Sequence, residues 1–417
     1  MNAPDLSALR ARFPALRRIQ DGRAVVIADA PGGSQVPDTV IEAVSARYRE
    51  GISNLDGAFA TSRETQQVVD AARQAGADLV GTSPERIVFG PNSTSLLFHA
   101  ARAFTRTLEP GDEVVVTRLD HDANIRPWVL AARDAGATVR WVDLRTEDAT
   151  LDIASFHEAL SDRTRLVAFT LASNGVGTIT PAAALVRTAK EAGALVAVDG
   201  VHLAQHRAID FDALGADLLS VSPYKVFGPH LGMLAAGPAV LDGWDPYRLR
   251  PAQDYPSPER WETGTQNHEG LAGFVAAVDY LAEAGRTFGD ATAESSRAAA
   301  VRAAFAVFGA HERALAARFL DGLARIDGAR LWGVNDPDRL DERTPTFALR
   351  LGDHHPAKTA EALGERGIFV WDGHYYAMEL MQRLGILDDG GAVRIGFCHY
   401  HTSDEADRVL DALADLA

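Results

Sequence analysis

Apolar runs alternate with segments of helical period through the middle of the chain. Strand-like runs occupy 86–89, 113–117, 138–142, 166–171, 195–198 and 217–221, and helical segments such as 94–107, 123–135 and 181–192 separate most of them. Strands that alternate with helices predict a mainly parallel sheet covered on both faces. A further apolar run at 231–236 is predicted to close this sheet as an antiparallel strand.

The segments before and after this alternating region predict further helices and strands, and those at the two ends of the chain form a second unit. Residues 1–20 indicate a short helix and lead-in, 24–27 a strand, and 36–48 and 63–80 helices on either side of a glycine-rich loop, 51–62, of the kind that often borders a site. An irregular stretch, 243–268, precedes a long helical region, 270–326, with an expected break near Gly285. Residues 329–417 alternate strand, strand, helix, strand, helix, strand, helix. We therefore expect a large domain at 22–285 and a small α+β domain from 1–21 and 286–417.

Composition narrows the class of protein. The 417 residues are 47% hydrophobic, which supports an ample core, and the net charge of -16 argues against a nucleic-acid or anionic-membrane partner. The single cysteine excludes an intrachain disulfide framework and fits a reducing compartment. No signal-peptide core or membrane-spanning run is visible, so we expect a cytoplasmic protein.

Polar residues follow two neighbouring apolar runs. Asp199 and His202 come after one run, and Ser222, Tyr224 and Lys225 come after the next. In a parallel sheet, ligands bind at the carboxyl ends of strands, so these side chains are candidates for one pocket.

Lys225 is the candidate residue whose side chain could react covalently. The chain has 41 lysines and arginines, but only three are lysines, and Lys225 alone of these stands in an aromatic, glycine-rich turn. A deprotonated lysine can form a Schiff base with a carbonyl, which arginine cannot do. The alternative is a loop lysine whose stem covers aromatic rings.

Other strand ends offer further candidates, each with an ordinary structural alternative. Ser93 and Thr94 open a helix, where they could bind phosphate or simply cap it. His121 could stack on a flat ligand, transfer a proton or, with Asp120 and Asp122, bind a metal, although ligand spacing is lacking. Asn174 could cap a turn or bind a ligand oxygen.

Charged residues in apolar strands complete the set. Asp199 follows a fully apolar strand and requires a cationic partner, such as a protonated ring nitrogen. Arg394 lies within an apolar strand and could bind a carboxylate or form an internal salt bridge. Cys398 is most simply a small buried apolar residue.

Taken in order, the segments VDGVH, SVSPYKVFGPH, ETGTQN and the arginine strand resemble the fold type I pyridoxal-phosphate enzymes. More narrowly, the chain resembles the class V aminotransferase group that includes the cysteine desulfurases. The resemblance implies an α/β fold with a large doubly wound, mainly parallel sheet domain and a smaller α+β C-terminal domain. It also implies pyridoxal 5'-phosphate as cofactor, a small amino acid as substrate and a homodimer.

The resemblance implies a role for each matching residue. Lys225 would bind the cofactor as a Schiff base, Asp199 would hold the pyridine nitrogen protonated, and His121 would stack on the ring. The remaining residues would bind phosphate (Ser93, Thr94, Ser222 and Tyr224, with Gly264 and Thr265 reaching it from the neighbouring subunit), the phenolic oxygen or substrate (Asn174 and His202) and the substrate carboxylate (Arg394).

One departure affects the expected reaction. Related desulfurases carry a nucleophilic cysteine in a GHHC-like segment, whereas this chain reads WDGHYYAME, with Tyr376 in that place. A persulfide requires a reachable thiolate. We therefore expect desulfurase-like lyase or transferase chemistry on a small α-amino acid, with an aminotransferase, an epimerase or a non-catalytic binding protein of this fold as alternatives. A nicotinamide enzyme is disfavoured because no G-x-G-x-x-G follows the first strand.

Overall fold

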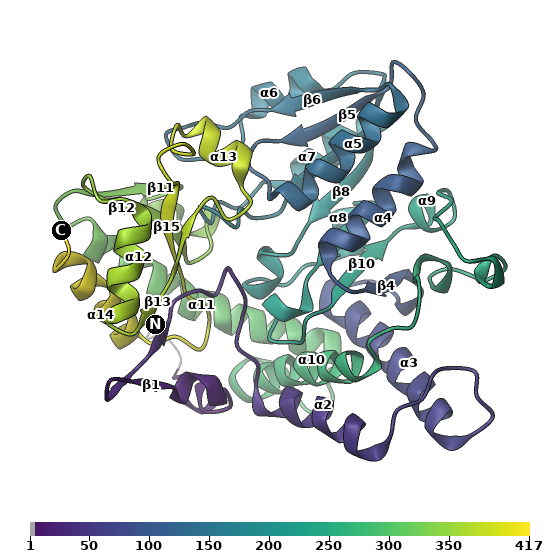
Figure 1. Ribbon diagram of the computed structural model, residues 1–417, viewed down its shortest axis with the longest axis horizontal. Coiled ribbons are helices and arrows are strands. Elements are labelled where there is room, and N and C mark those ends of the chain that lie inside the picture. Colours follow the sequence, from purple (N-terminus) through teal and green to yellow (C-terminus); the bar gives the residue numbers. More distant parts are fainter. Residues whose placement is uncertain (1–4) are drawn as a thin grey trace.

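The large sheet organises the chain, which a computed structural model describes over residues 5–417 (Figure 1). Residues 1–4 of the predicted lead-in lie outside the described residues. The strands are β4 (Ile87–Gly90), β5 (Glu113–Thr117), β6 (Thr138–Val142), β7 (Thr164–Thr170), β8 (Leu195–Asp199), β9 (Leu218–Val221) and β10 (Gly232–Ala236). Their spatial order is β4-β10-β9-β8-β7-β5-β6. The predicted α/β class with a mainly parallel sheet is confirmed.

Strand β10 has a different position in the sheet from the predicted one. It is antiparallel as expected, but it pairs with β4 on one side and β9 on the other, so it does not close the sheet. All five of its residues are buried. An apolar strand without charges is better suited to the interior of a sheet than to an edge, where unpaired backbone groups would face solvent.

Alternation along the strands explains the two helical layers. In β7, Leu166 and Ala168 join one apolar cluster, while Val167 and Phe169 join another on the opposite face. Helices α4 (Ser93–Thr105) and α5 (Arg126–Ala135) cover the first face. Helices α3 (Ala60–Val80), α7 (Ala182–Glu191) and α10 (His268–Phe288) contribute to the second cluster. Both faces of the inner strands are therefore largely closed to solvent, whereas Thr138 and Arg140 in the edge strand β6 are exposed. Polar groups that could bind a ligand lie mainly at the strand ends.

The remaining α-helices and strands before residue 297 are short, apart from α2. They are α1 (Ser7–Arg10), β1 (Ile19–Gln20), β2 (Arg23–Ala24), β3 (Val26–Ile27), α2 (Asp38–Glu50), α6 (Ile153–Ala159), α8 (Phe211–Leu214) and α9 (Pro238–Leu241). Among the helices of residues 5–417, none combines the length and apolar character needed to cross a membrane.

The C-terminal part has its own antiparallel sheet, ordered β11-β12-β15-β14. Its elements are α11 (Arg297–Leu323), β11 (Ala329–Trp332), β12 (Thr346–Leu351), α12 (Pro356–Glu365), β13 (Ile368–Phe369), β14 (Trp371–Gly373), α13 (Met378–Arg383), β15 (Ala392–Gly396) and α14 (Ser403–Ala414). The predicted alternation of strands and helices is confirmed. Strand β3 pairs with β13 in parallel, so the chain near residue 26 is joined to this part, and the domain limits stay a prediction.

Gly285 does not break the helix in which it lies. Helix α10 continues to Phe288, and the break falls at 289–296. A Cβ at Gly285 would lie 1.8 Å from the carbonyl oxygen of Ala300 in α11. Glycine is therefore needed at this position because the backbones of α10 and α11 approach each other closely there.

We expect Gly285→Ala to lower the stability of the protein by more than about 1–3 kcal/mol, the usual cost of overpacking, because a backbone atom is in the way. Gly309→Ala in α11 is the matched control, since nothing lies within 4 Å of its Cβ position. It should stabilise the helix by about 0.5–1 kcal/mol. Urea unfolding of both variants measures the difference, and equal stabilities would contradict the close approach.

Candidate active site

The predicted pocket residues meet at the carboxyl edge of the large sheet. Because β4, β5, β7, β8 and β9 run in one direction, the turns that follow them lie at the same edge. One cavity there is lined by Ser93, Thr94, Leu97, His121, Ala123, Thr170, Ala172, Asn174, Asp199, Val201, His202, Ser222, Tyr224 and Lys225. Side chains from five separate turns thus surround one space.

Lys225 ends the 3₁₀ turn η5 (Pro223–Lys225), which begins directly after β9 and Ser222. The turn is held from outside by Ser34, whose backbone N–H and hydroxyl both donate to the carbonyl of Tyr224, at 3.1 and 3.0 Å. Burial, reinforced by the charge of Arg394, lowers the pKa of Lys225 to about 8, although Asp199 and Asp29 act in the opposite direction. The amine is therefore partly neutral near physiological pH, as a nucleophile requires.

Asp199 is the last residue of β8 and is buried. Its Oδ1 accepts a hydrogen bond from the N–H of Val201 at 2.8 Å, which holds the carboxyl in place. Burial raises the pKa of Asp199, while this hydrogen bond and the charge of Lys225 lower it. A buried carboxyl facing the cavity gains from a cationic partner there.

Hydroxyl groups gather where α4 begins. Ser93 Oγ lies 2.8 Å from Ser222 Oγ and donates to the carbonyl of Val221 at 2.8 Å. Asn92 caps the helix by accepting from the N–H of Ser95, and Thr94 is exposed at the cavity wall. The helix start together with two serine hydroxyls is suited to an anion.

Both cavity histidines are neutral. Burial lowers the pKa of His121 to about 3, helped by the charges of Lys225 and Arg394, and its Nδ1 accepts from the N–H of Ala123 at 3.0 Å. Burial also lowers the pKa of His202 well below its ordinary range. His202 Nε2 lies 3.1 Å from the hydroxyls of Thr344 and Thr346, whereas its buried Nδ1 has no partner within the described chain.

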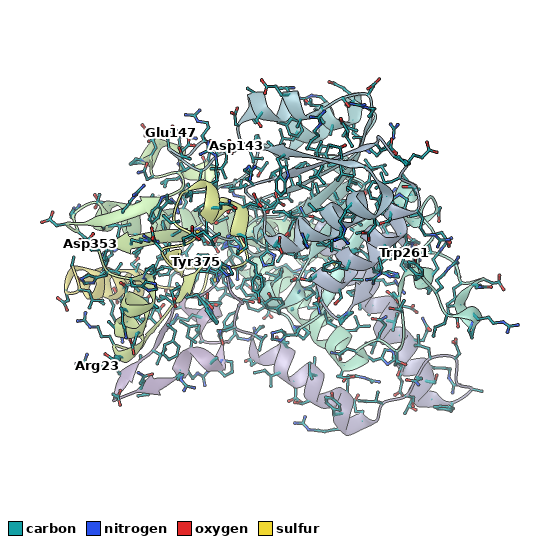
Figure 2. All side chains as sticks on the ribbon, turned by 45° about the horizontal axis from the view of Figure 1, so that its top comes forward. Arg23, Asp143, Glu147, Trp261, Asp353 and Tyr375 are labelled. Carbon is teal, nitrogen blue, oxygen red and sulfur yellow. The ribbon has the colours of Figure 1, made fainter. Side chains whose placement is uncertain are left out.

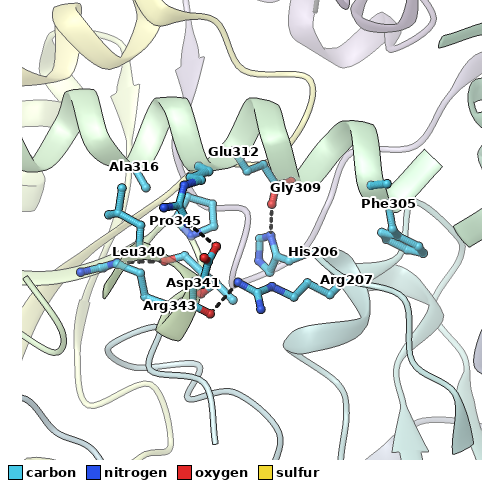
Figure 3. Close-up of a pocket in the computed structure, with 13 residues that line it drawn as sticks. His206, Arg207, Phe305, Gly309, Glu312, Ala316, Leu340, Asp341, Arg343 and Pro345 are labelled. Carbon is cyan, nitrogen blue, oxygen red and sulfur yellow. Dashed lines mark hydrogen bonds and ion pairs between the residues drawn. The ribbon is translucent and has the colours of Figure 1, made fainter. Parts of the chain in front are cut away.

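A second cavity, shown in Figure 3, is lined by residues that include His206, Glu312 and Arg343. There His206 Nδ1 lies 2.8 Å from Glu312 Oε2, and the His206 ring contacts that of His202 with centroids 5.0 Å apart. Arg343, also at this cavity, is buried, and burial lowers its pKa to about 9. This cavity shares none of the residues that line the first one.

Arg394 reaches the region from β15 but does not line the cavity itself. Its NH2 forms a salt bridge with Asp29 Oδ1 at 3.1 Å, and its NH1 donates to the carbonyl of Asn174 at 3.2 Å. The predicted alternative of an internal salt bridge is therefore present. One donor of the guanidinium, the buried Nε, has no partner among residues 5–417.

The resemblance places Gly264 and Thr265 at the phosphate of a neighbouring subunit, and they do not reach the cavity of their own chain. Gly264 and Thr265 are exposed, and neither lines it. In Figure 2, Trp261 lies well away from Tyr375, which stands where the C-terminal part meets the sheet. The loop at 51–62 was expected to border a site, but it also contributes no lining residue.

Sequence reasoning missed several neighbours of the site. Thr170, Ala172 and Val201 line the cavity, and Asp29 pairs with Arg394. Asp29 follows the apolar run at 24–28 just as Asp199 follows β8, so the same pattern could have identified it. Asp120 is not a free metal ligand: it accepts from Asn124 at 2.7 Å and from Thr117, and burial raises its pKa to about 8.

The family model described as "Aminotransferase class-V" matches residues 26–409. The chain belongs to the aminotransferase class-V family. A probable cysteine desulfurase from Streptomyces coelicolor is 30% identical, covering 98% of this chain and 96% of that protein. A cysteine desulfurase from Pectobacterium atrosepticum is also 30% identical, with 98% and 97% covered.

Solved structures agree with this class-V assignment. The apo structure of a cysteine desulfurase from Thermococcus onnurineus has a TM-score of 0.86 at 25% identity, covering 100% of this chain and 98% of that chain. A cysteine desulfurase from Escherichia coli has a TM-score of 0.82 at 26% identity, with 99% and 98% covered. The predicted family and fold are thus confirmed.

The buried amine of Lys225 should lower the stability of the cofactor-free protein. Its pKa falls to about 8 in the folded state, and it stands near 10.4 in the unfolded chain. Between these values only the unfolded chain keeps the proton, so stability rises with pH across this window. Lys225→Met should therefore stabilise the protein at pH 7 by up to about 3 kcal/mol, and the gain should shrink between pH 8 and 10.

Urea unfolding at pH 7 and pH 10 checks this prediction. Lys358→Met is the control, because Lys358 is an exposed lysine paired with Glu361. Its effect should be small at both pH values. An equal gain for Lys225→Met at pH 7 and pH 10 would show that the amine is not held at a lowered pKa.

Proposed function

We propose that the protein is a pyridoxal 5'-phosphate enzyme that catalyses desulfurase-like lyase or transferase chemistry on a small α-amino acid. The observation that carries the proposal is the pair of buried ionisable groups, Lys225 and Asp199, that line one cavity in a class-V fold. Membership of the family and the desulfurase relatives support the same reaction class.

The residues present fit this cofactor. Lys225 supplies a buried amine with a lowered pKa. Ser93 and Ser222 supply hydroxyls beside a helix start for the phosphate. The unpartnered Nδ1 of His202 is available to a polar group of the ring.

When bound, pyridoxal 5'-phosphate supplies an electron-withdrawing ring that stabilises negative charge at the substrate Cα. Asp199 would hold a proton at the ring nitrogen, and neutral His121 would cover one face of the ring without adding charge. The Nζ of Lys225 would take the proton from the substrate Cα, since its lowered pKa lets it accept and return a proton near neutral pH.

Sulfur transfer to a cysteine of this chain is not part of the proposal. Tyr376 stands where related desulfurases carry the thiol, and Cys398, the single cysteine, is fully buried. Burial raises the pKa of Cys398 well above its ordinary range, so its thiolate is strongly disfavoured. The departing group would therefore leave to solvent or to an external acceptor.

We further propose a cytoplasmic homodimer. Gly264 and Thr265 are exposed on this chain, and nothing lies within 4 Å of the Cβ position of Gly264. The resemblance implies that this segment reaches the phosphate of a neighbouring subunit, and its exposure leaves it free for that contact.

Cofactor capture tests the proposal directly. Protein mixed with pyridoxal 5'-phosphate should develop a visible absorbance band, and the rate of capture should rise with pH and reach half its maximum near the Lys225 pKa of about 8. Lys225→Ala should abolish the covalent band, whereas Lys358→Ala should keep it. A colourless wild-type protein would overturn the proposed function, and a band that does not respond to any amino acid would favour a binding protein.

Cys398→Ala should leave the release of sulfide or sulfinate from cysteine or cysteine sulfinate unchanged within about twofold, since the buried thiol is replaced by a small apolar side chain. Product release by wild type and variant under equal cofactor loading provides the measurement. A large loss of activity with unchanged melting temperature would show that Cys398 takes part in the reaction.

A further inference from the structure

Two consecutive tyrosines near the cavity have unusual backbone conformations. Tyr375 and Tyr376 have φ angles of +52° and +57°, in the left-handed region. Non-glycine residues in this region cost on the order of 1 kcal/mol or more each and persist only where surrounding contacts hold them. We call residues 374–376 the tyrosine turn.

The tyrosine turn is fixed by contacts with the predicted site. The carbonyl of Tyr376 accepts from the N–H of Asp122 at 2.7 Å, and the N–H of Tyr376 donates to His374 Nδ1 at 3.1 Å. The ring of Tyr376 lies against that of His121, with centroids 5.4 Å apart and planes tilted by 35°. The turn is therefore bound to the loop that carries His121.

Tyr375 makes the contacts that matter most for a substrate. Its carbonyl accepts from Asn174 Nδ2 at 2.9 Å, and its hydroxyl donates to the carbonyl of Ala392 in β15. The guanidinium carbon of Arg394 lies 4.5 Å from the centre of its ring. Tyr375, which is half-buried, thus contacts both residues assigned to the substrate: Arg394 through its ring and Asn174 through its backbone carbonyl.

Arg394 is consequently held on several sides. Asp29 binds its NH2, the carbonyl of Asn174 binds its NH1, and the ring of Tyr375 covers its plane. Only Nε, buried in the same environment, is left without an acceptor among the described residues. A buried donor without a partner is costly, so a ligand oxygen at this position would be favourable.

We propose that Tyr375 is a positioning residue that holds Arg394 and Asn174 as the carboxylate subsite for the amino acid. This inference rests on the proposed function and deepens it. Stacking on an aromatic face fixes the plane of a guanidinium, and the hydroxyl anchored to Ala392 fixes the ring. Without the ring, Arg394 would be free to turn fully toward Asp29.

Two reagents that differ in one carboxylate test the subsite. Aminooxyacetate and methoxyamine both react with a lysine-bound pyridoxal cofactor: a new C=N bond to the reagent nitrogen forms as the C=N bond to Lys225 Nζ breaks, and both N–H protons of the reagent pass to Nζ. Only aminooxyacetate has a carboxylate. The ratio of the two second-order rate constants, followed by cofactor absorbance, therefore reports the subsite and not turnover.

Wild-type holoenzyme should prefer aminooxyacetate. In Tyr375→Leu this preference should fall by about threefold to thirtyfold, the range for loss of an arginine–aromatic contact, while the methoxyamine rate should stay unchanged. Tyr375→Phe keeps the ring and should show a smaller fall, and it provides the test if the leucine variant does not fold.

Trp332→Leu is the matched control. Trp332 is buried in the small sheet, and Arg350 lies over its ring at 5.9 Å. This variant should keep the wild-type preference even if its melting temperature falls, which separates positioning from a general loss of packing.

The possible failures are distinguishable. No cofactor band in wild type would overturn the proposed function, and this inference with it. Equal rates for the two reagents in wild type would show that no carboxylate subsite exists. A wild-type preference that survives in both Tyr375 variants would overturn the role of Tyr375 alone.

Discussion

Burial of the seven-stranded sheet on both faces is the constraint on which the rest of the molecule depends. Residues such as Leu166 and Val167 in β7 point to opposite helical layers, so the inner strands are mostly apolar on both faces. Polar chemistry is confined to the turns after the strands. Lys225, Asp199 and His121 lie close together because the parallel strands end at the same edge of the sheet, so the five turns that follow them are neighbours.

Burial at the carboxyl edge of the sheet shifts the pKa values of the ionisable side chains that lie there. Burial is the largest influence on the pKa values of Lys225, Asp199 and both cavity histidines, and in each case it disfavours the charged form. An amine that can lose its proton near neutral pH is the result. The same burial that costs stability in the cofactor-free protein therefore prepares the amine for covalent chemistry.

The C-terminal part of the chain supplies residues that contact the turns around the cavity. Arg394 from β15, Tyr375 from the turn after β14, and Thr344 and Thr346 at the start of β12 all contact residues of the large sheet's turns. These contacts make the two parts interdependent, because Arg394 is held partly by Asn174 and partly by Asp29. The ring of Tyr376 lies against that of His121, with centroids 5.4 Å apart, so this side of the site is aromatic.

The sequence by itself determined the fold class, most strand limits to within one residue and the group of residues at the carboxyl edge. This is because burial of the inner strands imposes long apolar runs, and polar residues mark their ends. Strands 113–117 and 138–142 agree with the structure at both limits. Only the tertiary structure decided that β10 lies inside the sheet, that the backbones of α10 and α11 approach each other closely at Gly285, and that Arg394 pairs with Asp29. Each of these depends on a contact between segments far apart in the chain, which local periodicity does not encode.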